Sequence, residues 1–259
     1  YLISHIQTVK EGNWVPIREI PCNDEVASLL SSFNSMIAIQ TKMRDALIEA
    51  EKLKQQLSLN LLQQQVNPLF LYNTLDNICA LAELDEKETL IQLVMNLSSF
   101  YRSSLSNGKM HISIGQELEI SRAYLEILQI RYFHKFDFTI TCPEALKNYS
   151  CIKLLLQPIL ENSIYHGIKG LDRHGLLHIE AEDAGDCIRF TISDNGRGFS
   201  KEDYEKIWQQ DADHFGIKSI QQRILLYYGP GYGLSMESPQ TGGCITVITL
   251  PKQEGLPCH

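Results

Sequence analysis

The chain carries, at residues 157–167, the run Gln157-Pro158-Ile159-Leu160-Glu161-Asn162-Ser163-Ile164-Tyr165-His166-Gly167. An apolar stretch precedes it, and we expect one helix from Ile152 to Ile168. Along such a helix Leu155, Ile159, Asn162 and His166 fall close to one face. A core-facing stripe that turns from aliphatic to amide and imidazole either buries polar groups at a cost or lines a site.

Two glycine-containing turns follow this helix. The first is Asp194-Asn195-Gly196-Arg197-Gly198-Phe199, and the second is His214-Phe215-Gly216-Ile217, which opens another predicted helix. An amide-bearing helix, an acidic glycine turn and a glycine at a helix start are together typical of a nucleotide pocket.

The bulk composition narrows the class of protein. The chain has 259 residues, 44% of them hydrophobic, and a net charge of −8, which argues against a nucleic-acid partner. Its seven cysteines are scattered, a pattern typical of reduced thiols rather than of disulfides or zinc ligands. No run of 18 apolar residues occurs, and the start at Tyr1 without an initiator Met leads us to expect a fragment of a longer protein.

The N-terminal half is predicted to be helical. Apolar residues repeat at intervals of three and four from Val26 to Leu57, with one slip of phase and charged residues between them. This pattern favours a two-stranded coiled-coil seam; a long amphipathic helix packed on its own domain is the alternative. Met36 and Met43 belong to this stripe and are interpreted as packing residues.

Asn67-Pro68 interrupts the long helix, because proline in a helix interior costs about 3 kcal/mol or more. Helical spacing resumes after the proline, and a second helix is expected from Glu86 to Leu105. Two helices joined by a short polar turn form an antiparallel hairpin, which in a dimer closes as a four-helix bundle. A third helix, Gly115 to Phe133, is expected to end this bundle.

The C-terminal half changes to a mixture of strands and helices. Strands are predicted at Phe136–Thr141, Leu177–Glu182, Cys187–Ser193, Leu234–Ser238 and Cys244–Leu250, with a helix at Ile217–Tyr228. Helices segregated from a mostly antiparallel sheet indicate an α/β two-layer sandwich. The whole chain is therefore predicted to be α+β.

With both halves described, the sequence resembles the cytoplasmic part of a LytS/YesM-type sensor histidine kinase. The residues that carry the resemblance are the phosphoacceptor box at 64–75, the N box at 157–167, the first glycine box at 194–199 and the second at 214–229. The resemblance implies a GHKL (Bergerat-type) ATP-binding fold, ATP with Mg²⁺, a homodimer and a response regulator receiver domain as partner. It also implies attachment to the cell membrane through an upstream region, with this part on the cytoplasmic side.

The same resemblance divides the chain into four parts. Residues 1–40 are similar to the second half of a HAMP signal-relay module, and residues 41–66 correspond to a signalling coiled-coil helix. Residues 67–134 correspond to the dimerisation and phosphoacceptor hairpin, and residues 135–259 to the ATP-binding catalytic domain.

One departure from the family pattern concerns the phosphoacceptor itself. The family places its phosphorylated histidine directly after the Asn-Pro of the box, and here that position is Leu69. A leucine has no nucleophilic atom and cannot accept a phosphoryl group. Either an active kinase carries a recent or deliberate substitution, or a natural member has lost the step. The retained neighbours Phe70 and Tyr72 favour the former.

The expected pocket residues have distinct chemical roles. The Asp194 carboxylate can accept a hydrogen bond from the exocyclic amine of adenine, in a turn whose flexibility comes from Gly196 and Gly198. Asn162 offers a neutral oxygen to Mg²⁺, and Glu161 is the candidate general base. An isolated Asp-x-Gly-x-Gly would more often be an ordinary turn, and Glu161 read alone is a surface carboxylate.

Other candidates have weaker signals. His166 either touches phosphate or closes the pocket wall. The backbone at Gly216 can form an anion site for the triphosphate, with charge added by Lys218. Arg197 and Arg223 are candidates for phosphate binding or for surface pairing. Arg102 and Arg131 are expected to tie helices together through carboxylates rather than to hold a phosphoryl group.

The sequence thus predicts the kinase core of a two-component phosphorelay, in which the γ-phosphoryl group of ATP passes to a histidine and from that histidine to an aspartate of a response regulator. Leu69 is expected to abolish autophosphorylation of this chain. The alternative is a nucleotide-binding pseudokinase that acts as a signalling scaffold.

Overall fold

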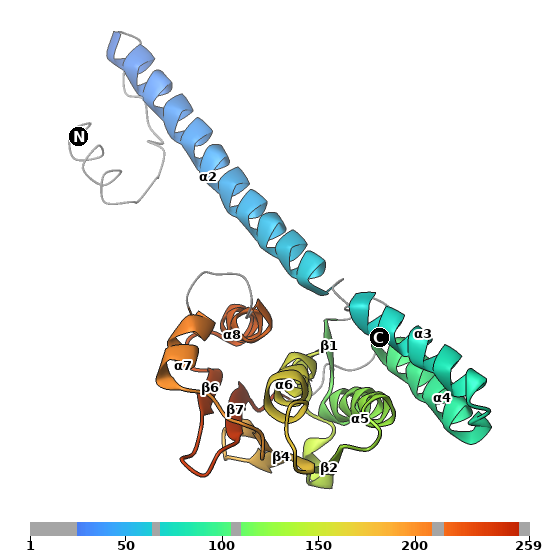
Figure 1. Ribbon diagram of the computed structural model, residues 1–259. Coiled ribbons are helices and arrows are strands. Elements are labelled where there is room, and N and C mark those ends of the chain that lie inside the picture. The colour runs from blue at the N-terminus through green and yellow to red at the C-terminus, as the bar shows by residue number, and fades with distance from the viewer. Residues whose placement is uncertain (1–24, 64–67, 105–109, 209–214, 254–259) are drawn as a thin grey trace. The chain divides into compact units, whose positions relative to one another are not determined.

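The computed structural model describes residues 25–63, 68–104, 110–208 and 215–253 (Figure 1). The chain divides into two compact units, Tyr1–Val66 and Asn67–His259. Most of the expected HAMP segment, part of the expected phosphoacceptor box (64–67) and His214 lie outside the described residues.

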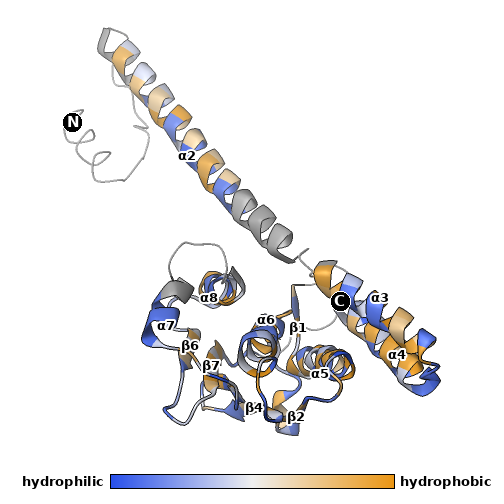
Figure 2. Cartoon of the chain, viewed as in Figure 1, coloured by the Kyte–Doolittle hydropathy of each residue, from blue (hydrophilic) through white to orange (hydrophobic). Residues whose placement is uncertain are grey.

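The first unit contributes one long helix, α2 (Glu25–Gln63). Its length confirms the predicted helix. Figure 2 shows apolar and polar residues interspersed along it. Several large apolar side chains on it are exposed: Leu29, Met36, Ile39, Met43, Leu47 and Ile48. The exposed apolar set on α2 fits the predicted seam, and pairing with a second helix remains a prediction.

The second unit begins with a helical hairpin. Helix α3 (Pro68–Glu83) starts at its proline, where the missing N–H costs nothing, and α4 (Lys87–Ser104) follows after a short turn. Phe70 and Phe100 lie with ring centroids 5.4 Å apart, and both contact Tyr124 of the next helix. This buried aromatic cluster joins the hairpin to the rest of the unit.

Helix α5 (Ile114–Arg131) connects the hairpin to the sheet domain. Ser113 and Gln116 form a complete capping box at its start. Immediately before it, strand β1 (His111–Ser113) pairs antiparallel with β3 (Ser150–Ile152). The helix packs against α4 on one side and against β2 and α6 on the other, and its inward residues are almost entirely buried.

The sheet domain is an α/β sandwich. Its five strands lie in the order β2-β4-β5-β7-β6; only β2 and β4 are parallel. The strands are β2 (Phe136–Thr141), β4 (Gly175–Asp183), β5 (Cys187–Asp194), β6 (Gly233–Glu237) and β7 (Cys244–Pro251). The remaining helical elements are η2 (Glu144–Leu146), α6 (Gln157–Asn162), η3 (Ser163–Ile168), α7 (Lys201–Trp208) and α8 (Phe215–Tyr228). These bounds confirm the predicted α+β class and the five predicted strands.

One helix boundary was predicted wrongly. Residues 152–156 are not helical: Ile152 ends β3, and Leu154 has a left-handed backbone with φ of 55°. The helix begins at Gln157 and continues as a π-helical turn from Ser163 to Ile168. Strands β1 and β3 and helix α7 were not predicted, because short pieces carry too little periodicity. Within the described ranges, none of the helices combines the length and apolar character that a membrane crossing requires.

Candidate nucleotide-binding site

A cavity of about 190 Å³ lies between the α6–η3 helix, the end of β5, the start of α8 and the strands β6 and β7. Its apolar lining comes mainly from Ile159, Phe199, Ile217 and Met236. Its polar lining includes the amide of Asn162, the imidazole of His166 and the carboxylate of Asp194. A largely apolar cavity with a few convergent polar groups is typical of a small-molecule site. Four of the cofactor-binding residues predicted from the sequence therefore line one cavity: Asn162, His166, Asp194 and Gly198.

Asp194 is the buried acid of the cavity, with 9% of its surface exposed. Its Oδ1 accepts a hydrogen bond from the Gly196 N–H at 2.9 Å. Its Oδ2 is buried, and no group in the described part of the chain donates to it. Burial raises the pKa of this carboxyl, and the nearby Ser163 hydroxyl, followed by the backbone of Gly196 and Cys244, opposes the rise. A buried acceptor that lacks a donor is costly unless a ligand supplies one.

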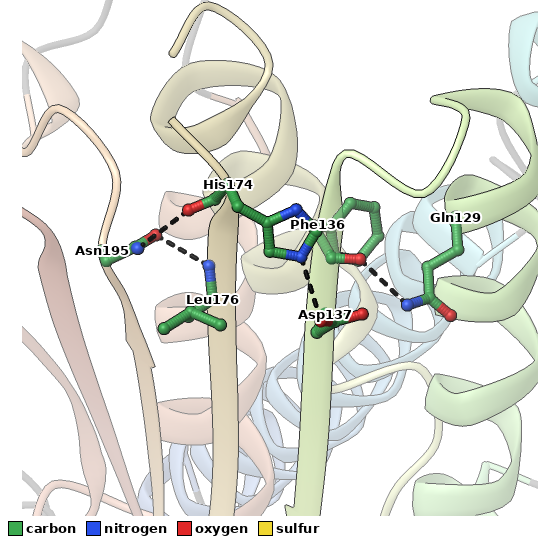
Figure 3. Close-up of polar contacts among 6 residues, drawn as sticks. All are labelled: Gln129, Phe136, Asp137, His174, Leu176 and Asn195. Carbon is green, nitrogen blue, oxygen red and sulfur yellow. Dashed lines mark hydrogen bonds and ion pairs between the residues drawn. The ribbon is translucent and has the colours of Figure 1, made fainter. Parts of the chain in front are cut away.

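The turn that carries Asp194 is held in place by its neighbour Asn195 (Figure 3). The Asn195 Oδ1 accepts from the Leu176 N–H at 2.7 Å, and its Nδ2 donates to the His174 carbonyl at 3.2 Å. Arg173 donates to the Asn195 carbonyl at 2.6 Å. Asn195 thus fixes the end of β5 against β4. Sequence analysis did not single it out, although asparagine side chains often replace backbone partners in turns.

Figure 3 also shows how β2 is attached beside this turn. The Asp137 carboxylate lies 3.0 Å from Nε2 of His174, and Gln129 of α5 donates to the Phe136 carbonyl at 2.9 Å. These contacts connect α5, β2 and the start of β4. The pocket turn is therefore anchored to the parallel strand pair.

The first glycine turn needs glycine at positions 196 and 198 because neighbouring atoms leave no room for a Cβ there. A Cβ at Gly196 would lie 2.6 Å from the Gly167 Cα, so the turn could not rest against the end of η3. Gly198 has φ of 71°, and a Cβ there would meet the Ser238 hydroxyl and the Gly243 carbonyl. Gly198 lines the cavity, whereas Gly196 does not line it and packs against the Asp194 carboxylate.

The α6–η3 helix presents two functional faces. Asn162 and His166 line the cavity, whereas Glu161 does not. Glu161 is half-buried and lies near Tyr124 and Tyr132 of the α5 region, where its charge helps to raise both tyrosine pKa values after burial. The structure therefore brings Asn162 and His166 to the pocket and leaves Glu161 facing α5.

Helix α8 starts beside Asn162. A Cβ at Gly216 would lie 3.4 Å from Cβ of Pro158 and 4.0 Å from Nδ2 of Asn162. The following Ile217 lines the cavity, whereas Lys218 does not. The first N–H groups of a helix have no partners within it, so this start offers donors to an anion next to Asn162.

The predicted arginine roles need correction. Arg223 neither pairs at the surface nor lines the cavity: its side chain is buried and donates to the backbone carbonyls of Lys153 and Leu154. Arg131 ties helices together as expected, but its partner is the Tyr165 hydroxyl at 3.0 Å rather than a carboxylate. Arg197 is exposed at the cavity, and Arg102 is exposed near the end of α4.

Leu69 lies in the first turn of α3 with 62% of its surface exposed. In the described residues no group of three or more histidine, cysteine, aspartate or glutamate side chains is arranged to hold a metal ion. A magnesium ion that arrives with nucleotide phosphates needs only one or two protein oxygens, and the Asn162 amide can supply one. The donor set therefore fits a nucleotide-borne magnesium ion rather than a resident metal.

Comparison with known proteins identifies both halves. Residues 49–136 match the family described as Histidine kinase. Residues 149–254 match the Histidine kinase-, DNA gyrase B-, and HSP90-like ATPase family. The resemblance predicted from the sequence motifs is thereby confirmed.

Several curated relatives are similar over most of the chain. Sensor histidine kinase YesM of Bacillus subtilis is 31% identical over 228 residues, which cover 88% of this chain and 39% of YesM. Sensor histidine kinase BtsS of Escherichia coli is 31% identical over 82% of this chain and 35% of its own length. Sensor protein LytS of Staphylococcus haemolyticus is 26% identical over 84% and 37%. The chain therefore spans less than two fifths of these relatives.

Solved structures give a more distant likeness. The catalytic domain of histidine kinase ThkA aligns with a TM-score of 0.45 and 16% identity over 56% of this chain and 97% of that one. ThkA in complex with the response regulator protein TrrA aligns with a TM-score of 0.45 and 16% identity over 81% and 66%.

Proposed function

This chain belongs to the histidine kinases and carries their ATPase domain, and from that premise we propose that it is the kinase core of a membrane-bound sensor histidine kinase. In this proposal the cavity binds ATP with Mg²⁺, the protein is a homodimer on the cytoplasmic side of the cell membrane, and a response regulator receiver domain is its partner. The predicted HAMP segment relays the signal from upstream.

The observation that carries the proposal is the unpartnered Oδ2 of Asp194 in an apolar-walled cavity. The exocyclic amine of adenine is a donor that fits this acceptor, and guanine presents a carbonyl oxygen at the equivalent position. Ile159, Phe199, Ile217 and Met236 would then surround the flat base. Asp194 therefore selects adenine.

The other end of the cavity suits phosphates. The N-terminus of α8 offers backbone donors beside Gly216, and the Asn162 amide lies next to it. When bound, Mg²⁺ neutralises phosphate charge. Asn162 would hold this ion through its amide oxygen, and His166 would contact phosphate or close the pocket wall. Glu161 faces α5, so a role as general base requires that the acceptor helix approach from that side.

The acceptor position is the exception in this chain. Leu69 is exposed on α3 but has no atom that can form a bond to phosphorus. We expect nucleotide binding to survive, because Leu69 does not line the cavity. The chain by itself is expected to be defective in autophosphorylation.

Calorimetry with Mg-ATP tests the nucleotide site. We expect the wild type to bind Mg-ATP and Asp194→Asn to bind it at least tenfold more weakly. The asparagine side chain lacks the negative charge, and its NH₂ group can face the adenine amine, which is also a hydrogen-bond donor. Asp186→Asn is the matched control, since Asp186 is exposed at the other end of β5 and should change nothing. Absence of binding to the wild type would end the proposal.

Incubation with labelled ATP tests the acceptor position. Leu69→His should create autophosphorylation, whereas Leu75→His, an exposed position on the same helix, should not. An unlabelled Leu69→His protein would contradict the kinase reading of this chain.

A nucleotide-binding pseudokinase is the second candidate, and Leu69 is the observation that favours it. In that role the chain holds nucleotide and a regulator without transferring phosphate. Mixing the wild type with a Leu69→His, Asp194→Asn subunit discriminates the two. A labelled partner means that the wild-type pocket is catalytic, and an unlabelled partner favours the scaffold.

A further inference from the structure

The turn that leads into the helix carrying Asn162 is held by a residue from another helix. Its own N-cap residue, Leu156, has no side chain that can accept a hydrogen bond. Glu117 of α5 binds the turn just before the helix instead: its Oε1 accepts from the N–H groups of Leu155 at 2.7 Å and Leu156 at 2.9 Å, and its Oε2 accepts from Leu154 at 2.9 Å. Glu117 is fully buried, so these three N–H groups take the place of water around its charge.

The same turn is held from its other side by Arg223 of α8. The guanidinium donates to the Leu154 carbonyl at 3.2 Å and to the Lys153 carbonyl through a shorter contact. Leu154 adopts a left-handed backbone, with φ of 55°, which lets successive N–H groups converge on one anion. Residues 153–156 are therefore clamped between a buried acid and a buried base from two different helices.

This clamp connects the elements that flank the phosphate end of the cavity. From the clamped turn, α6 leads directly to Asn162 and Ser163, and α8 carries Arg223 two turns after Gly216. Gly216 and Asn162 are neighbours, since a Cβ built on Gly216 would lie 4.0 Å from Nδ2 of Asn162. Neither Glu117 nor Arg223 lines the cavity. A shift of the turn would therefore move Asn162 relative to the start of α8 without any direct contact with nucleotide.

The adenine end of the cavity is anchored separately. Asp194 belongs to β5, and Asn195 ties that strand end to the backbone of β4. In the part of the chain that the structure describes, neither Glu117 nor Arg223 forms a hydrogen bond with this turn. The two ends of the site can therefore respond differently to a change in the clamp.

We propose that Glu117 and Arg223 are positioning residues that fix Asn162 and the start of α8 for the magnesium-bound phosphates. The inference rests on the proposed nucleotide function. It adds Glu117, which no sequence motif singled out, and gives Arg223 a positioning role in place of the direct phosphate contact or surface pairing expected from the sequence. Because α5 also packs against α4 of the hairpin, the clamp links the acceptor helices to the phosphate end of the pocket.

The test compares a ligand with phosphates and one without them. Wild type, Glu117→Gln and Arg223→Lys are titrated with adenosine by NMR and with a non-hydrolysable Mg-ATP analogue by calorimetry. Glutamine keeps one acceptor but turns an NH₂ toward a backbone donor, and lysine keeps the charge but loses the two-pronged geometry. Glu119→Gln, an exposed change on the same helix, is the matched control.

We expect both clamp variants to bind adenosine within threefold of the wild type and the Mg-ATP analogue at least tenfold more weakly. Equal weakening of both ligands, or an unchanged affinity for the analogue, would overturn the inference. Adenosine binding also reports that the pocket is folded, and Arg223→Lys decides the matter if Glu117→Gln does not fold. A wild type that binds neither ligand would overturn the proposed function itself. That result differs from one in which the wild type binds both ligands and the variants do not lose affinity for the Mg-ATP analogue selectively.

Discussion

Asp194 carries an electrostatic cost in the absence of a ligand. The carboxyl is buried and its pKa is raised, mainly by burial. Between the ordinary aspartate pKa and the raised value, the unfolded chain is ionised while the folded chain still holds the proton. The free energy of unfolding therefore falls as pH rises through this window, and the whole cost is present above the raised pKa.

Asp194→Asn should therefore stabilise the ligand-free protein at neutral pH while it weakens nucleotide binding at least tenfold. We expect a gain of about 1 kcal/mol in the free energy of unfolding, because the amide avoids burial of a charge. Urea unfolding at pH 7 and near pH 4, close to the ordinary aspartate pKa, measures this gain. The gain should shrink at the lower pH, and Asp186→Asn should show none. A destabilised variant at neutral pH would contradict the electrostatic account.

Gly196→Ala should push the first glycine turn away from the end of η3 through a steric clash. The new methyl group would lie 2.6 Å from the Gly167 Cα, which is backbone and cannot rotate away. We expect a loss of about 1–3 kcal/mol in the free energy of unfolding, together with weaker nucleotide binding. Gly170→Ala is the control, because a Cβ there meets nothing within 4 Å. Equal stabilities of the two variants, measured by chemical denaturation, would refute the close-approach argument.

The α6–η3 helix uses one face to line the cavity and the other to pack against α5. One face lines the cavity with Asn162 and His166, and the other contacts α5 through Tyr165. Arg131 lies over the Tyr132 and Tyr165 rings and donates to the Tyr165 hydroxyl. This contact is a second link between α5 and the pocket helix, at the opposite end from the Glu117 clamp.

Tyr165→Phe tests this second link. Loss of one charge-assisted hydrogen bond should lower the free energy of unfolding by about 1–2 kcal/mol, while the aromatic ring stays available to Arg131. Tyr149→Phe, whose ring lies near Lys252, is the control for removal of a hydroxyl and should cost less. Chemical denaturation of both variants provides the measurement, and equal losses would argue against a specific Arg131–Tyr165 contribution.

The elements that were predictable are those with long periodic patterns. The helices α2, α3, α4 and α8 and the five main strands repeat apolar residues often enough to define their type. The turn before α6 was read as helix because Ile152 to Leu156 is uniformly apolar. Its real conformation depends on Glu117 and Arg223, which lie far away in the sequence. Local patterns report nothing about such distant partners.

Part of the candidate site was predictable from short sequence motifs. Asp194, Asn162 and the glycines lie in recognisable motifs, and the structure places Asp194 and Asn162 at one cavity. The burial of Arg223 was not predictable, since an arginine on an amphipathic helix is usually exposed. The role of Asn195 depends on backbone groups of β4 that only the folded strand pair brings together.

In the whole molecule, the candidate pocket and the predicted dimer seam belong to different units. The candidate pocket lies entirely within the unit Asn67–His259, whereas α2 belongs to the other unit. Ile39 and Met43 of α2 are 56% and 64% exposed and lie one helical turn apart. We expect this stripe to form the seam of the predicted homodimer, as in a two-stranded coiled coil.

Ile39→Glu with Met43→Glu should therefore dissociate the dimer without affecting the pocket. Burial of an Ile or Met side chain contributes about 1.5–3 kcal/mol, so their loss from both subunits should weaken association at least a hundredfold. Sedimentation of the full chain measures the association, and calorimetry with Mg-ATP should give an unchanged affinity for each subunit. The control is Gln40→Glu with Arg44→Gln, which changes the charge by the same two units at neighbouring exposed positions. If the control dissociates equally, charge repulsion along α2 explains the effect; if neither variant dissociates, the seam lies elsewhere, and the exposed apolar residues of α3 and α4 become the alternative interface.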